Sequence, residues 1–239
     1  MPYFHYYGID WTYVVLVLPF VFLSLWASHN VNSTFKKYAR QYSSRGLTAA
    51  EAAQRVLRSN DVQGVRFERI SGSLTDHYDP RTNVIRLSDD VMNSTSTAAI
   101  GVACHEAGHA VQYARGYAPI KLRAAIIPIT NFGSRLAMPL ILLGIVFSFL
   151  GSFSTVLIYL GIACFSLSLI FQLVTLPVEF DASRRAMQAI EQTGLLNPEE
   201  QQGARRTLRA AALTYVAATA LSFAQLLRLV LLFGRRNDD

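Results

Sequence analysis

Cysteine is scarce in this chain, which excludes an architecture held together by disulfide bonds. Only Cys104 and Cys164 occur among 239 residues, and these two form no recognisable disulfide framework. Both stand in apolar stretches of the sequence. We therefore expect both to be small buried residues.

Charge is also scarce, and it is unevenly distributed. Charged residues make up 16% of the chain and apolar residues 51%, with a mean hydropathy of +0.26. These values are too apolar for an ordinary soluble domain. Residues 136–178 contain no Asp, Glu, Lys or Arg, and a bilayer crossing takes about 20 residues. Further uncharged runs cover residues 11–35 and 210–227, so the sequence predicts an integral membrane protein.

Nucleic-acid-binding motifs are missing, although the net charge is +6. We expect the excess of basic residues to meet anionic headgroups of the lipid bilayer, and we expect no nucleic acid as a partner. Four basic residues follow the first uncharged run: Lys36, Lys37, Arg40 and Arg45. Because basic residues beside a span mark its cytoplasmic side, we predict a multi-pass protein of the cell (plasma) membrane whose chain enters the cytoplasm after residue 28.

The uncharged runs predict about four transmembrane helices in a mainly α membrane protein. Residues 1–28 lack the basic start and the Ala-x-Ala site of a cleaved signal peptide, so we expect an N-terminal transmembrane anchor. Residues 136–176 should form a transmembrane hairpin that turns at Gly151, and residues 210–239 a membrane helix and tail. Four full spans would leave the basic tail outside, against the charge rule. Either Arg228 snorkels within a true span, or this last stretch does not cross fully.

Histidine is rare as well, with five in the chain, yet His105 and His109 stand only four residues apart. Residues four apart on a helix share one face, so both imidazoles can bind one Zn²⁺. Glu106 then falls beside the coordination position left for water, where it can accept a proton from that water. The neighbouring residues are small and apolar, and a metal is one reason to bury such polar groups. The alternative is a helix with two ordinary surface histidines.

A catalytic zinc site of this kind needs a third protein ligand. Two crossings return the chain to the same face of the membrane, so Glu179, the first charged residue after the hairpin, emerges on the side of the histidines. We expect it near the start of a helix that begins at Pro177. It could instead favour the helix dipole or pair with Arg184 or Arg185. Asp181 is the main rival ligand, although two residues along a helix is a rotation of about 200°.

The motif of residues 105–109, the hairpin after it and Glu179-Phe-Asp-Ala together resemble the HtpX-like and CAAX-prenyl-protease group of membrane zinc metallopeptidases. That group has its third ligand in a Glu-x-x-Ala-Asp segment. Ser183 occupies the final aspartate position here, and Asp181 is the candidate to replace that carboxylate. The chain more closely resembles the bacterial YugP-like family of neutral zinc metallopeptidases, over about residues 47–230. The matching segments begin at Leu74, Gly101, Leu173 and Ala211.

The resemblance implies a cytoplasmic, zincin-like α+β catalytic region, which we place in residues 29–135. Thr48 and Glu51 are spaced as a capping box at the start of a helix. Residues 65–70 and 84–87 look like strands of a small β-hairpin or sheet, with turn chemistry around Asp79-Pro80 between them.

The histidine helix should begin at a cap among residues 93–96 and end near Gly116. Gly108, between the two histidines, is expected to allow close packing of another segment or of the substrate against this helix; the alternative is an incidental helix glycine. Residues 118–135 predict a basic amphipathic helix at the membrane surface. Residues 177–209 predict a cytoplasmic helical region that carries the third ligand.

We therefore expect hydrolysis of peptide bonds in a protein or peptide substrate, with one Zn²⁺ per chain and Glu106 as general base. His77, Tyr78 and Tyr215 are candidates to donate to the developing oxyanion. His77 could equally be a turn histidine bonded locally, and Tyr215 could pack inside a helix near the membrane. Similarity to other metallopeptidases suggests that a strand before the histidine helix presents an edge to an extended substrate; the alternative is a plain hairpin strand. That strand is formed by Asn83, Val84, Ile85, Arg86 and Leu87.

Other classes remain as alternatives. Site-2-type intramembrane proteases share the histidine motif but take their third ligand from a Leu-Asp-Gly segment inside a span, which this chain lacks. Proteases linked to AAA ATPases share His-Glu-Ala-Gly-His, but nothing here resembles their phosphate-binding loop. A non-enzymatic alternative is a zinc-stabilised membrane scaffold or regulatory subunit. The sequence points to no particular oligomeric or regulatory partner.

Overall fold

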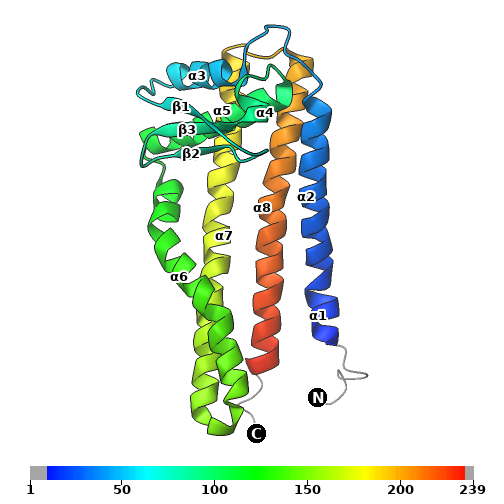
Figure 1. Cartoon of the computed structure of the whole chain (residues 1–239), viewed down its shortest axis with the longest axis vertical. Coiled ribbons are helices and arrows are strands. Elements are labelled where there is room, and N and C mark those ends of the chain that lie inside the picture. The colour runs from blue at the N-terminus through cyan, green and yellow to red at the C-terminus, as the bar shows by residue number, and fades with distance from the viewer. Residues whose placement is uncertain (1–9, 235–239) are drawn as a thin grey trace. The chain divides into compact units, whose positions relative to one another are not determined.

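The computed structural model describes residues 10–234, which are mainly helical with one small sheet (Figure 1). The parts of the predicted anchor and tail that fall in residues 1–9 and 235–239 lie outside the described residues. The elements in chain order are α1 (Trp11–Leu16), α2 (Leu18–Tyr38), α3 (Ala49–Ser59), β1 (Arg66–Ile70), β2 (His77–Asp79), β3 (Val84–Ser88), α4 (Asp89–Met92), α5 (Thr97–Ala114), α6 (Ala118–Val146), a 3-10 turn (Ser148–Leu150), α7 (Ser152–Gln192) and α8 (Pro198–Phe233).

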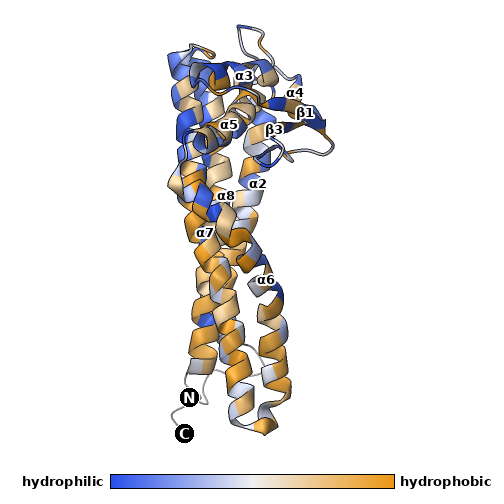
Figure 2. Cartoon of the chain, turned by 90° about the vertical axis from the view of Figure 1, so that its left-hand side faces the viewer, coloured by the Kyte–Doolittle hydropathy of each residue, from blue (hydrophilic) through white to orange (hydrophobic). Residues whose placement is uncertain are grey.

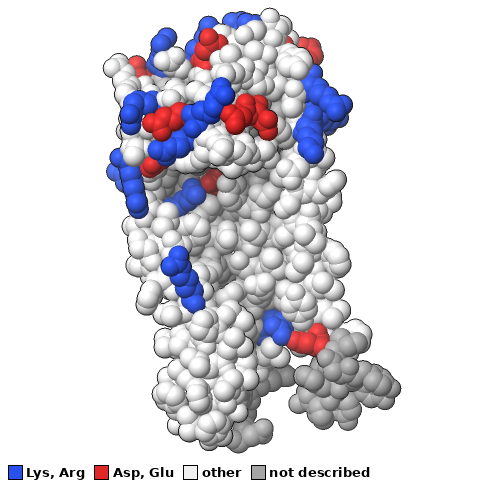
Figure 3. Space-filling model, viewed as in Figure 1, with Lys and Arg blue, Asp and Glu red and all other residues white. Residues whose placement is uncertain are grey.

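Contacts within the described chain divide it into two units. The first, called the apolar unit, comprises residues 10–26, 122–176 and 215–234, and the second, called the site unit, comprises residues 27–121 and 177–214. Hydrophobic residues dominate the helices of the apolar unit (Figure 2). On the face drawn in Figure 3, Lys, Arg, Asp and Glu side chains gather mainly over the site unit. The uneven charge of the sequence therefore corresponds to two parts of the fold.

Three of the described helices, α6, α7 and α8, are long and apolar enough to cross a membrane. Large apolar side chains are exposed on the apolar unit, among them Phe132 at 69% and Val146 at 65%. Soluble monomers rarely expose such extended apolar surface, so this unit suits a lipid environment. The first predicted span is not among the three, because its helix breaks at Val17, ahead of Pro19, into α1 and α2. A fourth span stays a prediction.

A helical hairpin is present, but its first helix is longer than expected. α6 is unbroken, so the surface helix predicted for residues 118–135 and the span after it form a single helix. Pro128 and Pro139 lie inside α6, as membrane helices tolerate. Gly144 and Gly161 let α6 and α7 approach closely, since a Cβ at either glycine would lie within 2.6 Å of an isoleucine on the other helix.

Arg228, which interrupts the last apolar stretch, has partners within the apolar unit. Its guanidinium donates to the Asp10 carboxylate and lies 5.4 Å from the centre of the Tyr13 ring. Asp10 also caps α1 by accepting a hydrogen bond from the Tyr13 backbone N–H at 3.1 Å. A charged group in an apolar setting needs such pairing. α8 thus continues through Arg228 to Phe233.

The site unit contains a mixed three-stranded sheet in the order β1-β3-β2. β1 runs parallel to β3, and β2 runs antiparallel to it. The two predicted strands are confirmed as β1 and β3, whereas β2 forms where the sequence predicted only a turn. The expectation that residues 83–87 offer a free edge is corrected, because β3 is the central strand and both of its edges are already paired. β2 is an edge strand instead.

The helix predicted to start after Thr48 is confirmed as α3. Thr48 and Glu51 make both hydrogen bonds of the capping box. α3 packs on α5, and α5 in turn contacts β2 and β3, around a core of small and branched apolar side chains. The larger members of this core that are fully buried include Val56, Ile85, Leu87, Ile100 and Val111.

The predicted histidine helix is confirmed as α5. Ser96 caps it by accepting from the Ala99 backbone N–H at 3.3 Å. The helix ends just before Gly116, which has a φ of +66° that suits glycine. Cys104 is buried within it, while Cys164 on α7 is half-buried, and both are free thiols.

α7 begins earlier than predicted, and this changes the position of Glu179, the predicted third ligand, within its helix. A helix was expected to begin at Pro177, but α7 is one continuous helix with Pro177 inside it. Glu179 therefore lies in the middle of a helix, and the alternative of a first-turn carboxylate that favours the dipole is wrong. The charged region of residues 177–209 is not one helix either, because a turn with Gly194 at φ +58° separates α7 from α8.

Candidate metal centre

His105 and His109 lie on one face of α5, as their spacing predicted. Their rings are 4.7 Å apart between centroids and nearly perpendicular, at 83°. His109 is buried, at 8% exposure, and so is Glu106, at 7%. The alternative of two ordinary surface histidines is therefore wrong.

Glu179 on α7 completes a group of three potential ligands. It is 2% exposed, and its Oε2 lies 3.2 Å from His105 Nε2 and 3.6 Å from His109 Nε2. The ligand atoms of the three residues all lie within 4.8 Å of one another. Neighbouring ligands around a tetrahedral Zn²⁺ would be separated by about 3.4 Å, given metal–ligand distances of about 2.0–2.1 Å. The residues present therefore fit a zinc ion.

The charges in this group also suit a cation. Burial raises the pKa of Glu179, but the hydrogen bonds with His105 and His109 outweigh burial and hold its pKa below the usual range. Burial lowers the pKa of His109, but Glu179 and Glu106 outweigh it and raise that pKa overall. The buried carboxylate therefore favours positive charge on its neighbours, and a metal ion supplies such charge.

Gly108 explains how α5 and α7 come close enough to share the group. A Cβ built on Gly108 would lie 2.6 Å from the Ala182 carbonyl oxygen, a distance that side chains do not adopt. The expected close packing at Gly108 is confirmed, and the packed partner is the backbone of α7.

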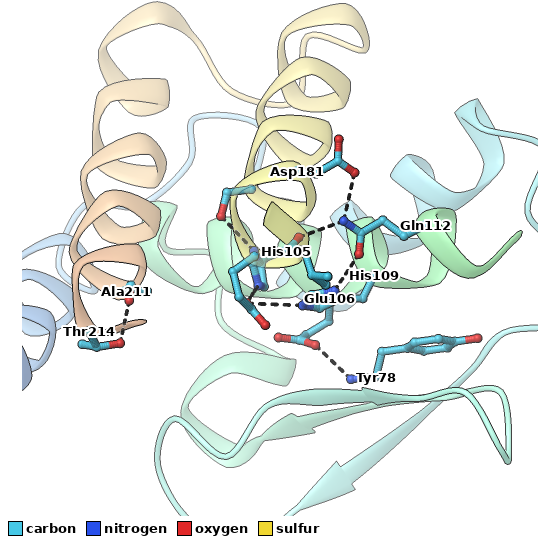
Figure 4. A network of polar contacts seen from close by, with 11 residues as sticks. Tyr78, His105, Glu106, His109, Gln112, Asp181, Ala211 and Thr214 are labelled. Atoms are coloured by element: carbon cyan, nitrogen blue, oxygen red, sulfur yellow. Dashed lines mark hydrogen bonds and ion pairs between the residues drawn. The ribbon is translucent and has the colours of Figure 1, made fainter. Parts of the chain in front are cut away.

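The histidine nitrogens that face away from Glu179 have different partners (Figure 4). His105 Nδ1 lies 3.1 Å from Ser183 Oγ. Ser183 occupies the sequence position of the aspartate in the Glu-x-x-Ala-Asp segment of the resembled group. His109 Nδ1 lies 3.0 Å from Gln112 Oε1. Gln112 is not among the residues predicted from the sequence, although its position three residues after His109 places it beside that histidine on the helix.

Asp181 lies outside the ligand group. Its carboxylate accepts from Gln112 Nε2 at 2.9 Å, from Arg185 Nε at 2.5 Å and from Arg184. Burial raises the pKa of Asp181, but these three hydrogen bonds outweigh burial and lower the pKa overall. The two arginines thus pair with Asp181 rather than with Glu179.

Glu106 is held by the edge strand of the sheet. Its Oε2 accepts from the backbone N–H of Tyr78 on β2 at 2.9 Å (Figure 4). Nearby, burial raises the pKa of Asp76; hydrogen bonds from Ser88 only partly offset this, and the charge of Glu106 raises it further. This backbone contact could not be predicted from the sequence, because a strand of three residues beside Pro80 has too short a pattern to be recognised.

The remaining candidates are placed as follows. The Tyr78 hydroxyl donates to Asn83 Oδ1 at 2.8 Å. His77 Nδ1 lies 2.9 Å from the Thr75 carbonyl oxygen, which is the local contact that the alternative interpretation expected. Tyr215 belongs to the apolar unit. Roles for His77, Tyr78 and Tyr215 in an oxyanion site stay predictions.

Comparisons with known proteins identify the family of this chain. Residues 13–234 match the family described as "Putative neutral zinc metallopeptidase". The "Putative membrane protease YugP" of Bacillus subtilis (strain 168) is 45% identical over 227 residues, which make up 95% of this chain and 99% of that protein. No solved structure matches the chain. The match along nearly its whole length shows that this chain belongs to the neutral zinc metallopeptidase family.

Proposed function

We propose that this chain is a membrane-bound zinc metalloendopeptidase that hydrolyses peptide bonds of protein or peptide substrates. The observation that carries the proposal is the convergence of His105, His109 and Glu179 on one point, with Glu106 on the same helix as the two histidines. Family membership supports the peptidase class, and three long apolar helices support the membrane setting.

In this proposal His105, His109 and Glu179 hold one Zn²⁺. When bound, the ion supplies an activated water and polarises the scissile carbonyl. The close approach of α5 and α7 at Gly108 keeps the three side chains together, and their burial excludes other water from most of the group.

Glu106 acts as general base and then as general acid. Its Oε2 is anchored by the Tyr78 N–H, so Oε1 is directed to take the proton of the attacking water. As the new C–O bond forms and the C–N bond breaks, the same carboxyl group passes this proton to the nitrogen of the leaving amine. Neither step changes the charge of the three ligands.

The substrate backbone lies beside β2 in this proposal. β2 is an edge strand, and the Tyr78 N–H points away from β3 toward Glu106. Because Glu106 already accepts from the Tyr78 N–H, an extended peptide along this edge would bond to the other backbone groups of β2 and bring its carbonyl groups toward Glu106. This edge replaces the central strand as the expected substrate-binding strand.

The proposal is tested with purified wild type, Glu106→Gln and Glu179→Ala. We expect about one zinc per wild-type chain and cleavage of casein. Glu106→Gln should keep the zinc and lose cleavage, because it removes the base and leaves the ligands. Glu179→Ala should lose both. The matched control, Glu191→Gln, changes an exposed glutamate that pairs with Arg205, and it should retain both.

Four outcomes would count against the proposal. Full cleavage by Glu106→Gln would show that Glu106 is not the general base. A wild type without zinc would show that the reaction does not use zinc. Cleavage confined to the membrane-spanning segment of a substrate would favour the intramembrane alternative. A zinc-loaded wild type that cleaves neither casein nor a membrane-proximal peptide library would favour the scaffold.

A further inference from the structure

Gln112 is a fully buried amide, at 0% exposure, next to the candidate metal centre. We propose that Gln112 is a positioning residue that fixes the tautomer and orientation of His109 and fastens the ligand-bearing turn of α7 to α5. This inference rests on the proposed zinc site. It concerns a residue that itself contacts neither the ion nor the substrate.

The partners of Gln112 determine which way its amide points. The Val178 carbonyl oxygen lies 2.8 Å from its Nε2, and Asp181 Oδ2 lies 2.9 Å away. A carbonyl oxygen can only accept a hydrogen bond. The Asp181 carboxylate can also only accept, because it is ionised between Arg184 and Arg185. The two N–H groups of the amide therefore face these oxygens, and only Oε1 is left for the third partner, His109.

This orientation decides the tautomer of His109. Oε1 can only accept, so His109 Nδ1, 3.0 Å away, must carry a proton. Nε2 of a neutral His109 is then unprotonated, with its lone pair directed toward the group shared with Glu179. A histidine ligand is commonly fixed in this way through its second nitrogen.

The same amide also acts on the third ligand. Val178 directly precedes Glu179 in α7, and Asp181 follows it by two residues. Gln112 bonds to both, so one side chain on α5 holds the turn of α7 that carries Glu179. Contacts with His109 and with this turn together fix two of the three ligands relative to each other.

The Nδ1 atom of His105 has a different kind of partner from the Nδ1 atom of His109. The partner of His105 is the Ser183 hydroxyl, which can donate or accept and therefore does not dictate a tautomer. The two histidines are thus held unequally, and we expect the site to depend on Gln112 more than on Ser183.

The test compares zinc affinity, measured by competition with a chromophoric chelator, in wild type, Gln112→Met and Gln112→Glu. Gln112→Met keeps the length of the side chain and removes all three hydrogen bonds, and zinc should bind about 10- to 100-fold more weakly. The visible absorption of the Co²⁺-loaded protein should also change, because it reports ligand geometry. Thr207→Val, at a buried threonine bonded within α8, is the matched control and should change neither readout.

Gln112→Glu separates positioning from packing. A glutamate can still accept from His109 Nδ1, so it should bind zinc more tightly than Gln112→Met. A role in packing alone predicts the opposite order, because a second buried carboxylate beside Asp181 disrupts the fold more than methionine does. Melting temperatures of the chelator-treated proteins show that each variant is folded. Should Gln112→Met not fold, weaker zinc binding with a changed Co²⁺ absorption in Gln112→Glu supports the inference, because glutamate lacks the N–H groups that hold Val178 and Asp181. Unchanged readouts in Gln112→Glu overturn it.

The outcomes distinguish this inference from the proposed function. A wild type that binds zinc, with unchanged affinity and Co²⁺ spectrum in Gln112→Met, overturns the positioning role and leaves the zinc peptidase intact. The positioning role is also overturned, with the peptidase intact, if Gln112→Met binds zinc at least as tightly as Gln112→Glu. A wild type that binds no zinc overturns both.

Discussion

At Gly108 the candidate centre depends on the absence of a single methyl group. The two candidate histidine ligands lie on either side of this residue on α5, and the backbone of α7 passes directly over it. Any side chain there would separate the helix that carries the histidines from the helix that carries Glu179. Whether the three candidate ligands can meet therefore depends on this single glycine.

We predict that Gly108→Ala weakens zinc binding and lowers the free energy of unfolding by about 1–3 kcal/mol through overpacking. The new Cβ would meet the Ala182 carbonyl oxygen at 2.6 Å, and a backbone atom cannot move aside cheaply. Gly101→Ala is the matched control on the same helix, where the Cβ would meet Ala204 at 3.2 Å. Zinc affinity and denaturant unfolding of both variants are the measurements. Equal zinc affinities for the two variants would contradict this explanation of Gly108.

At the scale of elements, the start of α8 is tied to the segment after α2. Glu200 Oε2 accepts from the Asn197 backbone N–H at 3.0 Å, and Asn197 Oδ1 accepts from the Glu200 N–H at 2.8 Å. Glu200 Oε1 also accepts from the Ser44 N–H at 2.6 Å. This buried carboxylate therefore caps a helix and joins two segments that are 156 residues apart.

These bonds predict a pH dependence of stability. Burial raises the pKa of Glu200, but the hydrogen bonds from Asn197 and Ser44 outweigh it, so the pKa lies below its usual value. A carboxyl group with a lowered folded-state pKa stabilises the protein above the unfolded pKa of 4.5. This contribution disappears as the pH falls through the folded-state value.

Glu200→Gln should lower the free energy of unfolding by about 1–2 kcal/mol near neutral pH. The difference from wild type should shrink as the pH falls below 4.5 and through the lowered folded-state pKa of Glu200. Glu199→Gln, at the exposed neighbouring residue, is the control and should show little change at either pH. Melting temperatures over this pH range test it, and a difference that grows in acid would contradict the assigned direction of the pKa.

At the scale of the whole molecule, charge and apolar surface separate into two units, and this separation allows the predicted orientation to be tested. The basic residues after the first uncharged run predict a cytoplasmic site unit. The turn between α6 and α7, reached by one crossing, should then face outward. Scarce cysteine makes labelling practical, since Cys104 is buried.

We predict opposite labelling of two exposed serines after conversion to cysteine in a Cys164→Ala background. Ser152→Cys, at the turn between α6 and α7, should react with a membrane-impermeant maleimide on intact cells. Ser73→Cys, in the site unit, should react only after the cells are permeabilised. Labelling of Ser73→Cys on intact cells would put the site unit outside and reverse the topology.

Features that depend on short-range spacing could be predicted from the amino-acid order alone. The helical period places His105 and His109 on one face with Glu106 beside them. The capping box of α3, the Ser96 cap of α5 and the turn at Gly151 are local backbone chemistry, and the structure confirms them. The long uncharged runs required apolar helices, because such runs cannot remain in water.

The choice of distant residues that complete the site depends instead on tertiary packing. His105 and Glu179 are 74 residues apart, and Tyr78 and Glu106 are 28 apart, so no local period relates them. Packing partners likewise determine three other features. These are the continuity of α6 and α7 through their prolines, the central position of β3 and the hydrogen bond from Gln112 to Asp181. Local sequence fixes which side of a helix a residue occupies, but only packing fixes what that side meets.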